Sequence, residues 1–170
     1  RRWAAGLRRE VENDELRVSE AAGKPRVDGR LDDAVWATAA EAGDFCDSFN
    51  SVEVHGQTQM RFLRDDQNLY VGIRASLSGL PPRRTRPPGS EDDSIWMADD
   101  SAELFLVEGV RKYQFVVGPD DIYTDNFHPD RTTPFSKEMF KWDCPGVEYK
   151  AATGENEWTG ELVIPLASLN

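Results

Sequence analysis

"GQTQMRFLRDDQNLYVGIRAS", which runs from Gly56 to Ser76, has the pattern of a β-hairpin. Apolar and polar residues alternate in both halves, and the polar segment 65–68 separates them. A period of two is typical of strands with one buried face, so the segment predicts two antiparallel strands joined by a turn. The faces expected for the second strand are Leu69, Val71, Ile73 and Ala75 on one side, and Tyr70, Gly72 and Arg74 on the other.

More short strands are expected after this hairpin. Turn residues separate the segments, and the longest interruption, residues 128–146, leaves room for one helical turn. The segments that have strand character are "SAELFLV", "KYQFVVG", "DIYTDNF", "GVEYKAAT" and "EWTGELVIP". Many short strands with little helix predict an all-β domain, an antiparallel β-sandwich of the immunoglobulin or jelly-roll kind.

The N-terminus is expected to be a separate arm. Trp3, Leu7 and Val11 recur at the spacing of a helical stripe. We therefore divide the chain into an N-terminal arm, residues 1–16, with a short helix, and a β-sandwich domain, residues 17–170. The charged start lacks both an initiator methionine and the apolar core of a signal peptide, so we expect the chain to be a processed piece of a longer protein.

Composition narrows the classes of partner. The net charge is −11, which argues against a nucleic-acid binder or a protein that docks on anionic membranes, because both need a basic face. The sequence contains no run of 18 apolar residues, so it predicts no transmembrane helix. The two cysteines, Cys46 and Cys144, lack the close spacing of a zinc or redox motif, so either a single disulfide or two separate thiols is compatible with the sequence.

Three ordered parts of the chain resemble one protein family. They are "PRVDGRLDDAVW" (residues 25–36), "DDQNLYVGIRA" followed by "DDSAELFLV" (residues 65–75 and 99–107), and "EWTGELVIPLASL" (residues 157–169). Together they resemble the family 9 carbohydrate-binding modules, within the DOMON-like β-sandwich superfamily. Members of this superfamily differ in function, so the resemblance is more specific for the fold than for the ligand.

The resemblance implies a non-catalytic binding module of an extracellular, periplasmic or cell-envelope protein, covalently linked to further domains. It also implies structural calcium and a sugar held between aromatic rings. Relatives usually continue with one more strand after the position of Leu169, so either the last strand is missing here or the C-terminus lies outside the ordered region. Trp36 and Trp158 fall in the framework segments and are expected in the core.

The acidic stretch "EDDSIWMADDSAELFLVE", from Glu91 to Glu108, contains the first candidate sites. A sugar offers an apolar C–H face and a rim of hydroxyls, so an aromatic ring flanked by carboxylates suits it, as Trp96 beside Asp92 and Asp93 would provide. Calcium prefers oxygen ligands, and its candidate ligands here are Asp99, Asp100 and Glu103. The alternative is that these carboxylates bind nothing and only discourage another chain from pairing with the start of the strand. In that strand, Leu104 and Leu106 are expected on one face and Phe105 on the other.

Further candidate sugar contacts lie elsewhere in the chain. Trp142 is in a loop beside charged residues, Asn126 and Phe127 are at the end of a strand, and Arg74 is on the polar face of the hairpin. Each residue also has a purely structural interpretation. A loop tryptophan can close one end of a sandwich, and a strand arginine can simply be solvated.

Three other functions are alternatives to sugar binding. Catalysis is disfavoured, because no nucleophile elbow, catalytic triad or H-E-x-x-H motif is present. Haem is the less expected cofactor, and its candidate axial ligands are Met60, Met97, Met139, His55 and His128. A structural or interaction module of a cell-envelope protein, with no small ligand, stays open. The prediction is a non-catalytic module that recognises a sugar or polysaccharide end, with a carbohydrate ligand and calcium.

Overall fold

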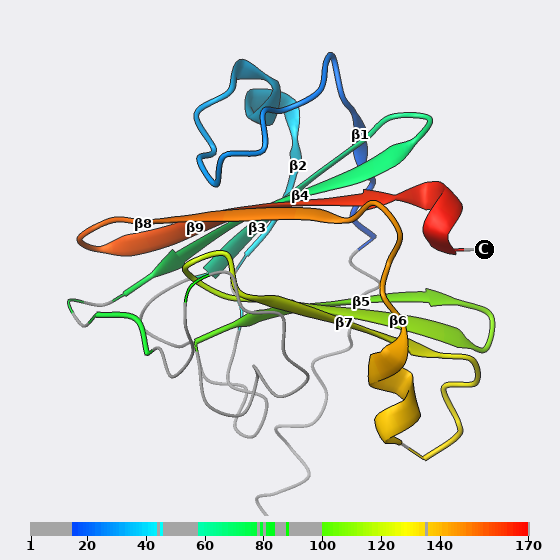
Figure 1. Ribbon diagram of the computed structural model, residues 1–170. Coiled ribbons are helices and arrows are strands. Elements are labelled where there is room, and N and C mark those ends of the chain that lie inside the picture. Colours follow the sequence, from blue (N-terminus) through cyan, green and yellow to red (C-terminus); the bar gives the residue numbers. More distant parts are fainter. Residues whose placement is uncertain are drawn as a thin grey trace, which may run out of the picture.

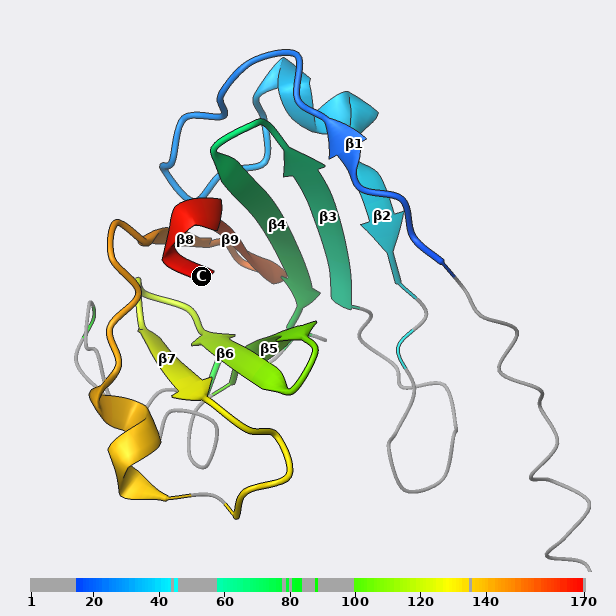
Figure 2. The same cartoon turned by 90° about the vertical axis from the view of Figure 1, so that its right-hand side faces the viewer.

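The chain folds into two β-sheets that face each other (Figures 1 and 2). This computed structural model describes residues 15–43, 45, 58–77, 79, 81–83, 88, 100–134 and 136–169. The larger sheet has the order β1-β3-β4-β9-β8, with β2 also paired to β3. Its strands are β1 (Ser19–Glu20), β2 (Ala40–Ala42), β3 (Thr58–Arg64), β4 (Asn68–Ser76), β8 (Glu148–Thr153) and β9 (Glu157–Pro165).

The smaller sheet has the order β5-β6-β7 and lies below the larger one in Figure 1. Its strands are β5 (Ala102–Glu108), β6 (Arg111–Val117) and β7 (Tyr123–His128). Three short 3₁₀ helices complete the described elements, namely η2 (Ala34–Thr38), η3 (Lys137–Lys141) and η4 (Leu166–Leu169). The predicted antiparallel sandwich is confirmed. One pairing departs from the pattern, because β1 runs parallel to β3.

The predicted hairpin forms as β3 and β4, with Thr58 opposite Ala75 and Arg64 opposite Leu69. Asp65 closes the turn, because its Oδ1 accepts hydrogen bonds from the backbone N–H groups of Gln67 (2.8 Å) and Asn68 (2.7 Å). The Tyr70 hydroxyl donates to Oδ2 of the same carboxylate at 2.6 Å, and this bond lowers the pKa of Asp65. The carboxylate of Asp65 therefore accepts the backbone N–H groups of the turn that have no partner in the strand ladder.

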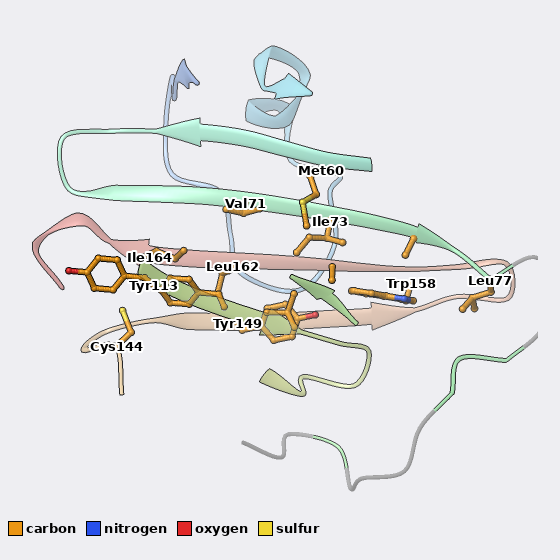
Figure 3. Packing of buried hydrophobic residues seen from close by; sticks show 14 residues of the cluster. Met60, Val71, Ile73, Leu77, Tyr113, Cys144, Tyr149, Trp158, Leu162 and Ile164 are labelled. Atoms are coloured by element: carbon orange, nitrogen blue, oxygen red, sulfur yellow. The ribbon is translucent and has the colours of Figure 1, made fainter. Parts of the chain in front are cut away.

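The main core lies between the two sheets (Figure 3). The larger sheet contributes one face of the hairpin, including Val71 and Ile73, as the alternation predicted. The smaller sheet contributes Tyr113 and Phe115 from β6. Trp158 from β9 is also buried here, with 2% of its surface exposed, so its assignment to the core is confirmed.

A second cluster covers the opposite face of the larger sheet. Trp36 packs there with Tyr70 and is 2% exposed, which confirms its predicted core role. A Cβ atom on Gly72 would lie 3.2 Å from the Trp36 ring, so a glycine at this strand position lets the indole approach the backbone. The indole N–H then donates to Oε1 of Glu161 at 2.9 Å.

Glu161 holds the segment before η2 against the larger sheet. Its Oε2 accepts the backbone N–H groups of Asp28 (2.8 Å) and Gly29 (2.9 Å). Gly29 has φ = +81°, and a Cβ atom there would come within 2.5 Å of the Ala151 carbonyl carbon, so this turn requires glycine. The carboxylate is 1% exposed, and burial raises the pKa of Glu161 against the opposing effect of these hydrogen bonds.

The turn between β6 and β7 is fastened to β8, the last strand of the larger sheet. Asp120 and Asp121 both have left-handed backbone angles, with φ of 64° and 62°. Oδ1 of Asp121 accepts the backbone N–H of Ala151 at 2.6 Å, and its Oδ2 accepts from Lys150 Nζ at 2.7 Å. The strained turn therefore connects the two sheets at this end of the sandwich.

Some predicted features lie in segments that the structure does not describe. The predicted N-terminal arm lies almost entirely there, as does Cys46, while Cys144 is a buried thiol. Among the described residues, no helix is long and apolar enough to cross a membrane.

Candidate functional site

The smaller sheet presents a regular array of side chains on the face turned away from the larger sheet, which we call the outer face. Strand register defines three rows of three residues on it. The first row is Glu103, Val116 and Thr124, the middle row is Phe105, Gln114 and Asn126, and the last row is Val107, Lys112 and His128. Successive rows are separated by two residues along a strand, which is about 7 Å.

The outer face is polar and yet buried along β6 and β7. Gln114 is 9% exposed and Asn126 is 0% exposed, and Thr124 and His128 are also buried. Among the described residues, neither Nδ2 nor Oδ1 of Asn126 has a hydrogen-bond partner. Buried amides are almost always hydrogen-bonded, so an amide without a partner among the described residues is a candidate for binding a group outside them.

The β5 side of the outer face is open and partly apolar. Phe105 is 47% exposed and Val107 is 52% exposed. Lys112 Nζ lies 5.3 Å from the centroid of the Phe105 ring, which is within the range of a cation–π interaction. Gln114 Nε2 donates to Glu103 Oε2 at 3.0 Å, which orients the central amide of the array. An exposed ring thus lies in one row with two side-chain amides.

His128 lies beside Lys112 in the register of β6 and β7. Burial, and secondarily the positive charge of Lys112, lower the pKa of His128 below its ordinary value. The imidazole is therefore expected to be neutral at pH 7, and it can both donate and accept hydrogen bonds.

The structure separates the predicted sugar contacts into different places. Asn126 belongs to the outer face, but Phe127 points to the other side of β7, where its ring centroid lies 4.9 Å from that of Tyr113. Trp142 joins this inner group, with its ring centroid 5.5 Å from Tyr113 and 5.9 Å from Phe127. It is half-buried there and packs against the core.

Arg74 lies on the outer side of the larger sheet, where its Nε is 3.6 Å from a Glu157 carboxylate oxygen. The two sheets place Arg74 and Asn126 on opposite sides of the sandwich. Asp100, a predicted calcium ligand, accepts the backbone N–H of Arg83 at 2.9 Å. It lines an open cavity of about 360 Å³ at the end of the sandwich, together with Trp158.

Four predicted site residues, Asp92, Asp93, Trp96 and Asp99, lie outside the described residues. Within the described parts of the chain, no group of three or more His, Cys, Asp or Glu side chains could hold a metal ion. The third predicted calcium ligand, Glu103, is the carboxylate that binds Gln114 on the outer face.

The candidate haem ligands that the structure describes lie in different parts of the fold. His55 and Met97 lie outside the described segments, while Met60 and Met139 are buried. Met60 belongs to the core between the sheets, whereas His128 is on the outer face.

The sequence did not single out Phe105, Lys112 and Gln114 as ligand contacts. It did predict that Phe105 takes the face opposite Leu104 and Leu106, and this is confirmed, because both leucines pack against the core. The missing signal was the polar residue at every second position of "YTDNFH". Such alternation predicts a strand, but it does not say that its polar face is buried.

Comparisons with known proteins agree with this fold. A candidate carbohydrate-binding protein from Bacteroides uniformis superposes with a TM-score of 0.64 at 14% identity, covering 89% of this chain and 72% of its own. A carbohydrate-binding module of family 9 from Caldicellulosiruptor kristjanssonii, solved in complex with cellotriose, gives a TM-score of 0.54 at 15% identity, covering 88% of this chain and 67% of its own.

No curated protein matches the chain significantly. The sequence model described as "Carbohydrate family 9 binding domain-like" matches residues 27–170, which include every strand of both sheets except β1. This match bears out the resemblance of the three framework segments. The chain therefore belongs to the carbohydrate family 9 binding domain-like family.

Proposed function

We propose that this domain is a non-catalytic carbohydrate-binding module and that its sugar lies on the outer face of the smaller sheet. Family membership supports a carbohydrate as the ligand. The family 9 module from C. kristjanssonii binds cellotriose, which shows that a related fold can hold a chain of sugars. The chemistry of the outer face supports the location.

The middle row has the parts that a sugar requires. A pyranose ring presents C–H groups to an aromatic face and hydroxyls at its edge. Phe105 offers an exposed ring, and the amides of Gln114 and Asn126 offer donors and acceptors in the same row. A hydroxyl both donates and accepts, so one amide can bind two neighbouring hydroxyls.

The observation that carries the proposal is the amide of Asn126. It is 0% exposed, and neither of its polar atoms has a partner among the described residues. A buried polar atom without a hydrogen bond costs about 1–3 kcal/mol, which sugar hydroxyls would relieve on binding. The amide therefore reduces stability in the free domain and increases affinity in the complex.

The experiment is a binding screen against a glycan array, followed by calorimetry on the glycans retained. Asn126→Leu replaces the amide with an apolar side chain of similar size, and Asn156→Ala changes an exposed asparagine of the β8–β9 turn as the control. Asn126→Leu should weaken binding at least tenfold, which is the loss of about one good hydrogen bond, while its melting temperature is unchanged or higher. Unchanged affinity, or a large loss of stability, would contradict the proposal.

We further propose that the module is part of a larger exported protein and that Trp96 adds a stacking ring. Trp96 precedes β5 by only a few residues in the sequence, and β5 contributes Phe105 to the outer face. Trp96→Ala should weaken glycan binding as Asn126→Leu does, whereas Trp142→Ala should act mainly on stability, because its ring packs on the inner cluster.

A further inference from the structure

Lys112 belongs to the described cations that have no carboxylate partner among the described residues, as do Arg17, Lys24, Arg30 and Arg131, and it is set apart by its contact with an aromatic ring. In the described residues, Arg26, Arg61, Arg64, Arg74, Arg111, Lys141 and Lys150 each lie within 4.0 Å of a carboxylate. Lys112 has no such partner among them, although the chain carries 31 acidic residues against 20 basic ones. Its ammonium group instead lies over the ring of Phe105.

Among the described residues, the neighbours of Lys112 in its row of the outer face are neutral. Its row contains Val107 and His128 and no carboxylate. The acidic residue of the face, Glu103, is two rows away, or about 13–14 Å along the strands, and it already accepts a hydrogen bond from Gln114. The lowered pKa of His128 agrees with a positive local potential, since Lys112 contributes to it after burial.

The position of Lys112 relative to Phe105 fits a particular arrangement of ligand. A sugar ring stacked on the exposed phenylalanine would direct its hydroxyls along the middle row, toward Gln114 and Asn126. A substituent directed toward the last row would meet the Lys112 ammonium, only 5.3 Å from the ring centroid. A carboxylate in that place forms a charge-assisted hydrogen bond, which is about twice as strong as a neutral one.

We propose that Phe105 and Lys112 form a subsite for the carboxylate of an acidic sugar, so that the module prefers glycans containing uronic acids over neutral glycans. This inference rests on the proposed function, because it assigns a ligand class to the same outer face. The net charge of the domain does not oppose it, since charges more than about 10 Å away are largely screened at physiological salt.

The test compares pairs of ligands that differ only in charge. Oligomers of galacturonic, glucuronic and mannuronic acid are titrated in their acid forms and as fully methyl-esterified forms. At least one acid form should bind about tenfold more tightly than its ester, and added salt should reduce the difference. Equal affinity of every acid and ester pair would overturn the inference.

Variants identify the side chain responsible. Lys112→Met retains the apolar stem and should abolish the preference for the acid form, while Lys112→Arg should preserve it. Lys24→Met, an exposed lysine outside the array, is the matched control and should have no effect. A preference that survives in Lys112→Met would also overturn the inference.

The two proposals fail in different ways. If neutral oligomers such as cellotriose bind in an Asn126-dependent manner while acid forms gain nothing, the binding function stands and the Lys112 subsite is refuted. If no glycan in either set binds, or if Asn126→Leu leaves all binding unchanged, the proposed site itself is refuted, and the ligand class with it.

Discussion

Replacing Glu161 with alanine should destabilise the domain by about 3 kcal/mol. The carboxylate accepts three N–H groups, from Asp28, Gly29 and the Trp36 indole, at 2.8–2.9 Å. The last two bonds are buried, and each buried donor left without a partner costs about 1–3 kcal/mol. Water can replace the part-buried bond to Asp28, and removal of a buried charge offsets some of the loss.

Urea unfolding followed by tryptophan fluorescence would measure this change. At a domain of this size the melting temperature should fall by roughly 6–12 °C, since 1 kcal/mol corresponds to about 2–4 °C. The control is Glu41→Ala, which removes an exposed ion pair with Arg61 (3.1 Å) and should cost less than about 1 kcal/mol.

The pH dependence gives a second and independent check on Glu161. Burial raises its folded pKa above the ordinary value of 4.5, so the folded domain retains this proton at pH values where the unfolded chain has lost it. The stability contributed by Glu161 is therefore greatest below pH 4.5 and declines as the pH rises through the raised pKa. The difference in the free energy of unfolding between wild type and Glu161→Ala should therefore become smaller as the pH rises over that range. A loss below about 1 kcal/mol, or a gap that widens with pH, would refute this reasoning.

Three other predictions concern separate parts of the fold. Asp121→Ala should lower the free energy of unfolding, measured in urea, by about 2 kcal/mol, because it removes the hydrogen bond to Ala151 and keeps a non-glycine residue in a left-handed conformation. Asp121→Gly should cost about half as much, because glycine adopts that conformation without strain. Equal losses in the two variants would contradict the role of strain. In a Cys46→Ser background, a thiol reagent should label Cys144 only on unfolding, because burial raises its pKa to about 11, and rapid labelling of the folded domain would show otherwise. Millimolar calcium should raise the melting temperature and EDTA should reverse it if the predicted calcium site exists; no shift would exclude that site.

Much of the fold follows from local sequence patterns. The alternation in the β3–β4 hairpin and in β5 predicts which side chains reach the core, because a strand has a period of two and one face must be buried. The framework tryptophans Trp36 and Trp158 were also placed correctly from the segments around them. In these places local pattern and tertiary packing agree.

The candidate site was less predictable, because it depends on register between strands. Phe105, Gln114 and Asn126 come from three strands and become one row only when β5, β6 and β7 pair in this register. The sequence grouped Phe127 with Asn126 in one sugar site, although adjacent strand residues point to opposite faces. It also grouped Trp142 with them, although the Trp142 ring packs beside Tyr113 and Phe127 on the inner side. Pairing between distant segments has no local signal, so the array could be recognised only in three dimensions.

The contact between Asp121 and Ala151 also affects how the domain behaves at high concentration. β8 ends the larger sheet, and the N–H of Ala151 points away from β9, where the edge of a second molecule could pair with it. Asp121 occupies that donor and places a carboxylate beside it, which discourages edge-to-edge association. Loss of this side chain should therefore increase the tendency of the domain to aggregate, in addition to weakening its fold.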